Sequence, residues 1–247
     1  MLTIENARDF VAKNAMPIPE TVHPHSKDSW ACVDGRVKSA GRFAGPGGAL
    51  GIEFALFAGL EQLEKDTGIA ITAKPEDISR EVETFFGGMS CHTDTHAAHE
   101  GKTLHCAGCG HCNGALQNPS EYGLQKYAPY LREHVEHLTI QPEVLDGNHG
   151  EQAVIIIKKA KSQDQAFSLP GTGADGRQAF ICHWDDYLET LAALAESVVT
   201  RVMGEQVSPE ALIASAKKAA ERQLITTLDR LAKNSPRFIA SRTGSGA

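Results

Sequence analysis

Residues 30–63, WACVDGRVKSAGRFAGPGGALGIEFALFAGLEQL, contain in order a strand pattern, a glycine-rich loop and a helix pattern. Residues 30–33 form a short apolar run that ends at the turn signal Asp34-Gly35, as a buried strand does. The glycine-rich loop covers residues 41–51. After it, apolar residues recur at the spacing of one helical face, at Ile52, Leu56, Leu60 and Leu63. This order predicts a strand, a loop and a helix, which is the repeating unit of α/β folds.

The rest of the chain continues this alternation. Further buried strands are predicted at residues 89–92, 153–157 and 179–182. Further helices are predicted at residues 75–86, 120–138, 186–202 and 208–231. Ser120 and the capping-box pair Asp186 and Glu189 are expected to begin two of these helices. We therefore expect an α/β fold, with a central mixed β-sheet flanked by helices.

The chain has 247 residues, of which 41% are hydrophobic, and this suits one large domain with a core of its own. We expect an N-terminal arm at residues 1–28 and a single α/β metal-binding catalytic domain at residues 29–240. Residues 241–247 are expected to form a flexible tail.

Charge and composition exclude several classes of protein. The formal charge is −7 and no run is rich in Lys and Arg, so we expect no nucleic-acid partner. No apolar run approaches the ~20 residues of a membrane helix, so we expect no membrane partner. Six cysteines lie near several of the 11 histidines, and we expect no secretory signal, because the first residues lack a basic region followed by an apolar one. This pattern indicates metal or redox chemistry in the cytoplasm rather than a disulfide framework.

The segment CVDGR puts three functional side chains at alternate positions, Cys32, Asp34 and Arg36. Alternate residues of an extended segment point the same way, so a thiol, a carboxylate and a guanidinium can share one pocket. A thiolate there can bind zinc, and the guanidinium can orient the carboxylate by a bidentate pair. The alternative is a buried Cys32 beside an ordinary turn, with Arg36 in solvent.

Two more segments add metal-binding side chains. His92 ends a predicted strand, and Cys109 precedes a predicted helix N-terminus, where the helix dipole favours a thiolate. Together with Cys32 they supply two sulfurs and one nitrogen. Three protein ligands leave a fourth tetrahedral position open, as in catalytic zinc sites.

These motifs resemble those of the carbonic anhydrases of the beta/zeta superfamily, and most closely those of the zeta, or cadmium, type. The shared pattern is CVDGR from Cys32, GPGG from Gly45, HTD from His92 and GCG from Gly108. A later segment, DGNHGEQAVII from Asp146, is also similar to that family. The likeness covers roughly residues 30–160.

The resemblance implies a lyase that hydrates carbon dioxide reversibly to bicarbonate. Metal ligands would be Cys32, His92 and Cys109, holding Zn²⁺ or Cd²⁺, and the metal-bound hydroxide would attack carbon dioxide. Asp34 would orient that hydroxide, and Arg36 would keep Asp34 off the metal. Carbon dioxide and bicarbonate would be the small-molecule partners. A homodimer is expected from the beta-type relatives, although cadmium-type modules can act singly.

The segment between His92 and Cys109 leaves alternatives open. Cys106 is an alternative third ligand, and His96 or His99 could shuttle protons. Cys106, Cys109 and Cys112 have the spacing of an iron–sulfur run, but Leu116 stands where its fourth cysteine would be. The same cysteines could hold a closed structural zinc with a histidine. A third alternative keeps the site and changes the substrate to carbon disulfide or carbonyl sulfide.

Overall fold

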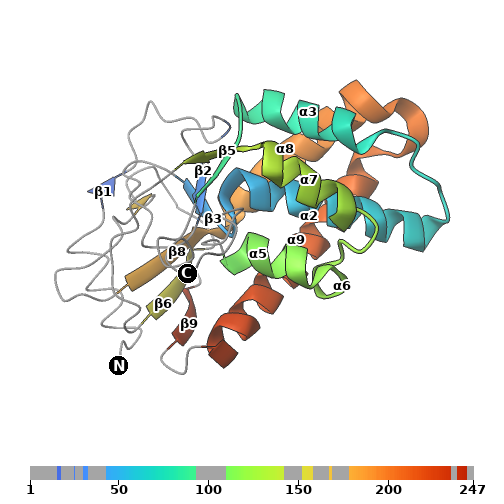
Figure 1. Ribbon diagram of the computed structural model, residues 1–247. Helices are drawn as coiled ribbons and strands as arrows, with labels where there is room; N and C mark the ends of the chain where they lie inside the picture. The colour runs from blue at the N-terminus through green and yellow to red at the C-terminus, as the bar shows by residue number, and fades with distance from the viewer. Residues whose placement is uncertain are drawn as a thin grey trace.

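The computed structural model describes residues 16–17, 25, 30–32, 43–92, 110–141, 152–157, 167–168, 178–234 and 238–243. The helices are α2 (Gly48–Thr67), α3 (Pro75–Phe86), α5 (Gly110–Gln117), α6 (Pro119–Tyr122), α7 (Ala128–His137), α8 (Trp184–Val198) and α9 (Pro209–Asn234). A π-helical turn, Val199–Met203, and a 3₁₀ turn, Gly204–Gln206, join α8 to α9. Figure 1 shows that these helices pack together as one group, with the longer strands to one side of it.

Helix α2 lies at the centre of the helical group (Figure 1). It contacts α9 along its length and also meets α3, α5 and α8. A hydrogen bond from Ser215 Oγ of α9 to the carbonyl oxygen of Gly59 in α2, 2.8 Å long, joins the two long helices. At this point Gly59 has no side chain, so the two backbones can come close together.

Burial on every side distinguishes α2 from an ordinary amphipathic helix. Every residue from Gly48 to Glu61 is buried. Helices that are apolar all round belong in the interior, and the segment from Ala49 to Leu60 carries a single charged residue, Glu53. The sequence therefore selects α2 as the central helix of this core.

The helices predicted from residues 52, 75 and 208 onwards are confirmed as α2, α3 and α9. Helix α3 has a proline in its first turn and ends at Gly87, whose φ of +67° suits glycine. Ser208 Oγ accepts a hydrogen bond from the backbone N–H of Ala211 and so caps α9. The capping-box start of α8 is wrong, because α8 begins at Trp184 and Asp186 already lies inside its first turn.

The helix predicted over residues 120–138 is two helices, α6 and α7. Gly123, with φ of +74°, ends α6 in the left-handed conformation, and Leu124 N–H bonds to the Pro119 carbonyl oxygen. Pro129 then occupies the first turn of α7. Ser120 lies inside α6 rather than at its N-cap. The apolar period continues across the break, so periodicity could not reveal it.

Replacing Gly123 with alanine is expected to destabilise the protein by about 1 kcal/mol, because a left-handed backbone is strained for residues with a Cβ. The space around this position is adequate, since an added Cβ would lie 3.4 Å from Arg222 Nη2. Urea denaturation of Gly123→Ala and Gly123→Asn measures the effect. The asparagine variant should lose less stability, since asparagine tolerates this conformation. Equal losses in both variants would contradict the backbone explanation.

The strands that the structure describes form four separate sheets. They are β1 (Met16–Pro17) with β7 (Phe167–Ser168), β2 (Trp30–Cys32) with β3 (Phe43–Gly45), β4 (Ser90–His92) with β5 (Thr139–Gln141), and β6 (Gln152–Ile157) between β8 (Gln178–His183) and β9 (Phe238–Thr243). The β1–β7 pair is antiparallel, and every other pair is parallel.

The expected α/β fold with a central mixed β-sheet is wrong. The described residues are mostly helical, and none of their sheets combines parallel and antiparallel strand pairs. The predicted strand segments do appear, as β2, β4, β6 and β8. Their partners depend on contacts between distant parts of the chain, which a local apolar pattern does not contain. The division into an arm, one domain and a tail stays a prediction.

Among the described residues, no helix is both long enough and apolar enough to cross a membrane.

Candidate functional site

Cys32 is the last residue of β2, and its side chain is half-buried. The parallel register pairs it with Gly45, the last residue of β3. Trp30, at the other end of β2, is buried and stacks on Phe43 with ring centroids 5.7 Å apart. This apolar stacking fixes the start of the two strands, so both carboxyl ends meet at one edge.

The GPGG segment at residues 45–48 begins at this edge. Gly47 has a φ of +75°, and α2 starts at the next residue, Gly48. The predicted glycine-rich loop is therefore shorter than expected, because the helix already includes Gly48 and Gly51. A Cβ on Gly51 would overlap the carbonyl oxygen of Pro46. These glycines allow the turn to fold tightly onto the first turn of α2.

The first turn of α5 packs against the same glycine turn. A Cβ on Gly47 would lie 2.8 Å from Cys112 Sγ and 3.0 Å from His111 Cδ2. On its other side, His111 Nδ1 lies 2.8 Å from Thr227 Oγ1 of α9, which also lies 3.1 Å from the hydroxyl of Tyr122. His111 is thus held between α2 and α9, and α5 begins at a fixed place beside residues 45–48.

The structure describes part of the predicted metal site. Cys32 ends β2, and His92 ends β4, whose parallel partner β5 places Gln141 opposite it. Asp34, Arg36 and Cys109 lie outside the described residues, as do Cys106, His96 and His99. The segments brought together are therefore the end of β2, the glycine turn and the first turn of α5, which follows Cys109 directly in sequence. In the described part of the chain, no group of three or more His, Cys, Asp or Glu side chains is placed to hold a metal ion.

Cys112, the last cysteine of the possible iron–sulfur run, lies in the hydrophobic core with 1% of its surface exposed. Its Sγ faces the Gly47 backbone. Such a position is typical of a cysteine that packs as a small apolar residue. Because Cys106 and Cys109 lie outside the described residues, the cluster itself stays a prediction.

A second polar group, absent from the sequence analysis, lies beneath α3 and α7. Glu53 of α2 is fully buried, and Ser79 Oγ of α3 donates a 2.6 Å hydrogen bond to its Oε1. His134 Nε2 of α7 lies 3.3 Å from Glu53 Oε2. One carboxylate therefore ties three helices together. The only sequence signal was a single glutamate inside an apolar helix, which marks a buried charge that needs partners.

The environment of this group changes its protonation. Burial acts to lower the pKa of His134, but the contact with Glu53 and the charges of Glu53 and Glu83 outweigh it and raise that pKa above 6.5. A raised value favours an imidazolium that compensates the buried carboxylate. Burial raises the pKa of Tyr130 to about 12, so its phenol stays protonated near neutral pH.

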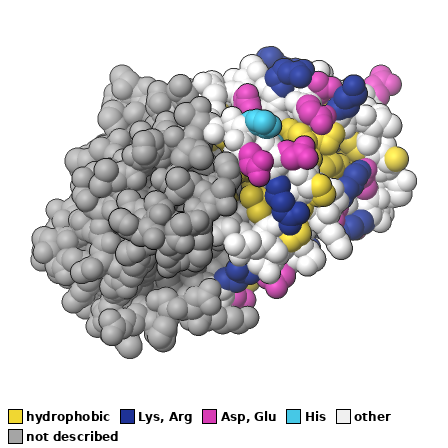
Figure 2. All heavy atoms as spheres, in the orientation of Figure 1, with side chains coloured by type: hydrophobic (Ala, Val, Ile, Leu, Met, Phe, Trp, Pro, Cys, Tyr) yellow, Lys and Arg dark blue, Asp and Glu magenta, His cyan; other side chains and the backbone are white. Residues whose placement is uncertain are grey.

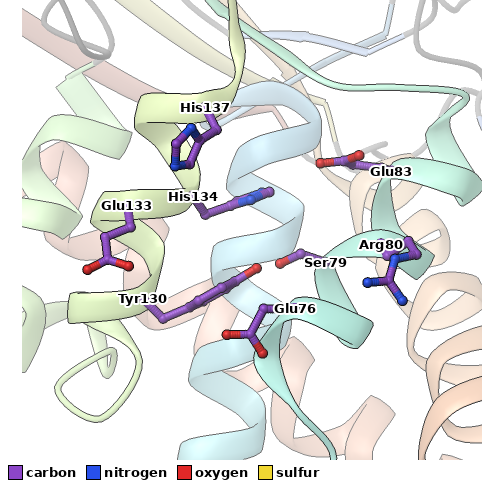
Figure 3. A pocket seen from close by; sticks show the side chains of 8 residues that line it. All are labelled: Glu76, Ser79, Arg80, Glu83, Tyr130, Glu133, His134 and His137. Carbon is purple, nitrogen blue, oxygen red and sulfur yellow. The ribbon is translucent and has the colours of Figure 1, made fainter.

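A pocket of about 340 Å³ opens above this group, between α3 and α7. Figure 3 shows its lining side chains, which are Glu76, Ser79, Arg80, Glu83, Tyr130, Glu133, His134 and His137. The ring of Tyr130 stacks on His134, with centroids 5.7 Å apart. In Figure 2, acidic and basic side chains alternate over the described part of this face, and a histidine lies among acidic ones.

No family model matches this chain, and neither does any curated protein or solved structure.

Proposed function

We propose that this protein hydrates carbon dioxide reversibly to bicarbonate, at a metal centre held by Cys32, His92 and Cys109. The observation that carries the proposal is the meeting of three motif segments. Cys32 pairs with Gly45, and two residues later Gly47 contacts the first turn of α5, which follows Cys109. The end of β2 and the start of α5, far apart in the sequence, thus approach one glycine turn, and this supports a shared site.

The donor set of the proposed centre fits zinc or cadmium. Both metals accept thiolate and imidazole ligands, and three such ligands leave one coordination position open. Cys32 is half-buried at a strand end, so the residue is partly shielded from bulk solvent. The metal, when bound, would supply the Lewis acidity that activates water.

Two side chains of the protein would orient the reacting water. We assign to Asp34 the acceptance of a hydrogen bond from the reacting water, which aligns the water with carbon dioxide. Arg36 would hold that carboxylate ionised and in place through paired N–H···O bonds. The glycine turn at residues 45–48 lets neighbouring side chains pack directly on its backbone, since a Cβ on Gly45 would overlap the ring of Tyr187 and one on Gly47 would lie 2.8 Å from Cys112 Sγ. A reducing, cytoplasmic setting is part of the proposal, since it keeps thiolates available as ligands.

The test measures metal content and carbon dioxide hydration in single variants. Cys32→Ser should lose most of its metal, because serine is a poor ligand for a soft site. Asp34→Ala should keep its metal and lose hydration by roughly a hundredfold, as expected for a missing proton acceptor. The matched control is Cys112→Ala, which removes a thiol from the core beside the same turn and should keep its metal.

The alternative sites and substrates predict different metal content and hydration in the same variants. Loss of metal in Cys112→Ala would favour a closed structural site or an iron–sulfur site. Full metal content in Cys32→Ser would rule out the proposed centre. Metal that requires Cys32, without hydration of carbon dioxide in the unchanged protein, would favour carbon disulfide or carbonyl sulfide as the substrate.

A further inference from the structure

A pocket lies between α3 and α7, and none of its lining residues belongs to the proposed metal centre. Its volume of about 340 Å³ falls within the range of roughly 300–1,000 Å³ that small-molecule sites occupy. Side chains of α3 and α7 face each other across it, and α2 lies beneath (Figure 3). The stacked rings of Tyr130 and His134 form one wall.

The charge around this pocket is unbalanced. Glu76, Glu83 and Glu133 line it, and none of them makes an ion pair with another residue that the structure describes. The one lining arginine, Arg80, directs its Nη1 to Asp77 at 2.8 Å and is largely exposed. The lining therefore carries three carboxylates without a cationic partner among the described residues, and this negative charge favours the entry of a cation.

The buried base of the pocket is a second, independent observation. Glu53 Oε2 and His134 Nε2 are both buried, and neither makes a hydrogen bond in the described structure, although they lie 3.3 Å apart. The side chain of Glu53 is fully buried, and that of His134, which lines the pocket, is 9% exposed. Buried polar atoms without aligned hydrogen bonds are rare and costly. A positive group in the pocket would interact favourably with the rim, and also with this buried carboxylate once His134 has lost its proton.

We propose that this pocket binds a small organic cation that carries primary ammonium groups on a short aliphatic stem. The carboxylates of Glu76, Glu83 and Glu133 would bind the ammonium groups by charge-assisted hydrogen bonds. The face of Tyr130 suits the positive end or the aliphatic stem, since aromatic faces attract cations. A bare metal ion fits less well, because the described side chains form no group of three metal ligands.

Binding of such a cation is linked to the protonation of His134. The groups around His134 are Glu53 from α2, then Glu76, Arg80 and Glu83 from α3, and Tyr130, Glu133 and His137 from α7. An imidazolium and an ammonium in one pocket repel each other, so the cation binds more tightly once His134 has lost its proton. Affinity should therefore rise with pH through the titration of His134.

The test is isothermal titration calorimetry of the full chain with 1,4-diaminobutane, at constant ionic strength set by sodium chloride. We expect one saturable site. Glu83→Gln and Glu133→Gln should each weaken binding by about threefold to fivefold, as the loss of one partly exposed ion pair does. Glu136→Gln is the matched control, because Glu136 is an exposed carboxylate of α7 outside the pocket. It should leave the affinity unchanged, and His134→Gln should remove most of the pH dependence.

Three results would overturn the proposal. Absence of saturable binding would mean that the pocket has no affinity for organic cations. Equal weakening by Glu136→Gln and Glu83→Gln would show attraction by diffuse charge. Competition by Mg²⁺ at equal ionic strength, with the same loss in the glutamine variants, would assign the pocket to a metal ion.

Discussion

Gly59→Ala is expected to destabilise the protein by about 2 kcal/mol, as overpacking of a closely packed interior does. A Cβ at this position would lie 2.6 Å from Ala216 Cα and 2.7 Å from Ala216 N. Both are backbone atoms of α9, so no side chain can rotate out of the way. The two long helices would have to separate, and the 2.8 Å bond from Ser215 Oγ to the Gly59 carbonyl oxygen would lengthen.

Local helix propensity predicts the opposite sign for the same substitution. Alanine in place of a helical glycine stabilises an exposed helix by about 1 kcal/mol. The experiment therefore separates packing of α2 on α9 from intrinsic preference. Urea denaturation measures the change, with Ala214→Ser as the control, which adds one heavy atom on the exposed side of α9. An increase in the stability of Gly59→Ala would show that the two helices do not approach as closely as described.

His134→Leu is expected to cost about 3–5 kcal/mol, the loss that follows when one partner of a buried ion pair is removed. Glu53 would remain fully buried with its Oε1 bonded to Ser79 Oγ and with no positive charge near its Oε2. The side chain of Glu53 is fully buried, so solvent would not replace the lost partner.

The pH dependence of this loss has a definite sign. The folded-state pKa of His134 is raised above 6.5, so the stability it contributes is complete below that value. The contribution is lost as pH rises through the raised folded-state value. The difference in unfolding free energy between the unchanged protein and His134→Leu should therefore be larger at about pH 5.5 than at about pH 9.

The matched control is His137→Leu, an exposed histidine on the same helix and in the same pocket. It should change stability little at either pH. A His134→Leu loss that is the same at both pH values would contradict an imidazolium paired with Glu53.

The helices were the predictable part of this fold. Apolar spacing found α2 and α9, and the proline–glycine punctuation of α3 gave both of its ends. The break between α6 and α7 was not predicted, because the apolar period continues across Gly123. The positive φ of Gly123 is what ends α6. The glycines of residues 45–51 suggested a loop, whereas Gly48 and Gly51 lie inside α2 because they allow Pro46 to approach it.

The fold class was not predictable from the same information. The strand segments were recognised, but a short apolar run does not specify its partner. Trp30 pairs with Phe43 nearby in sequence, whereas Ser90 pairs with Thr139, which is distant. The sheet expected from alternation was wrong because the core of the described residues is formed by helices around α2.

The candidate site also has features that the sequence predicts and features that it does not. The sequence predicted a short strand at residues 30–33, and β2 at Trp30–Cys32 confirms it. The contact of Gly47 with His111 and Cys112 depends on how α5 packs, and no local pattern encodes it. Glu53 and His134 lie 81 positions apart in the sequence, so no local pattern could predict their contact. The sequence showed only that Glu53 is a single charged residue within an apolar helical segment.

The central claim of a catalytic metal centre is tested most directly by elemental analysis of the purified protein, paired with stopped-flow hydration of carbon dioxide. The account predicts about one zinc or cadmium per chain and fast hydration that disappears when the metal is removed and returns when it is restored. Protein that contains iron, or that binds no metal under reducing conditions, would contradict it.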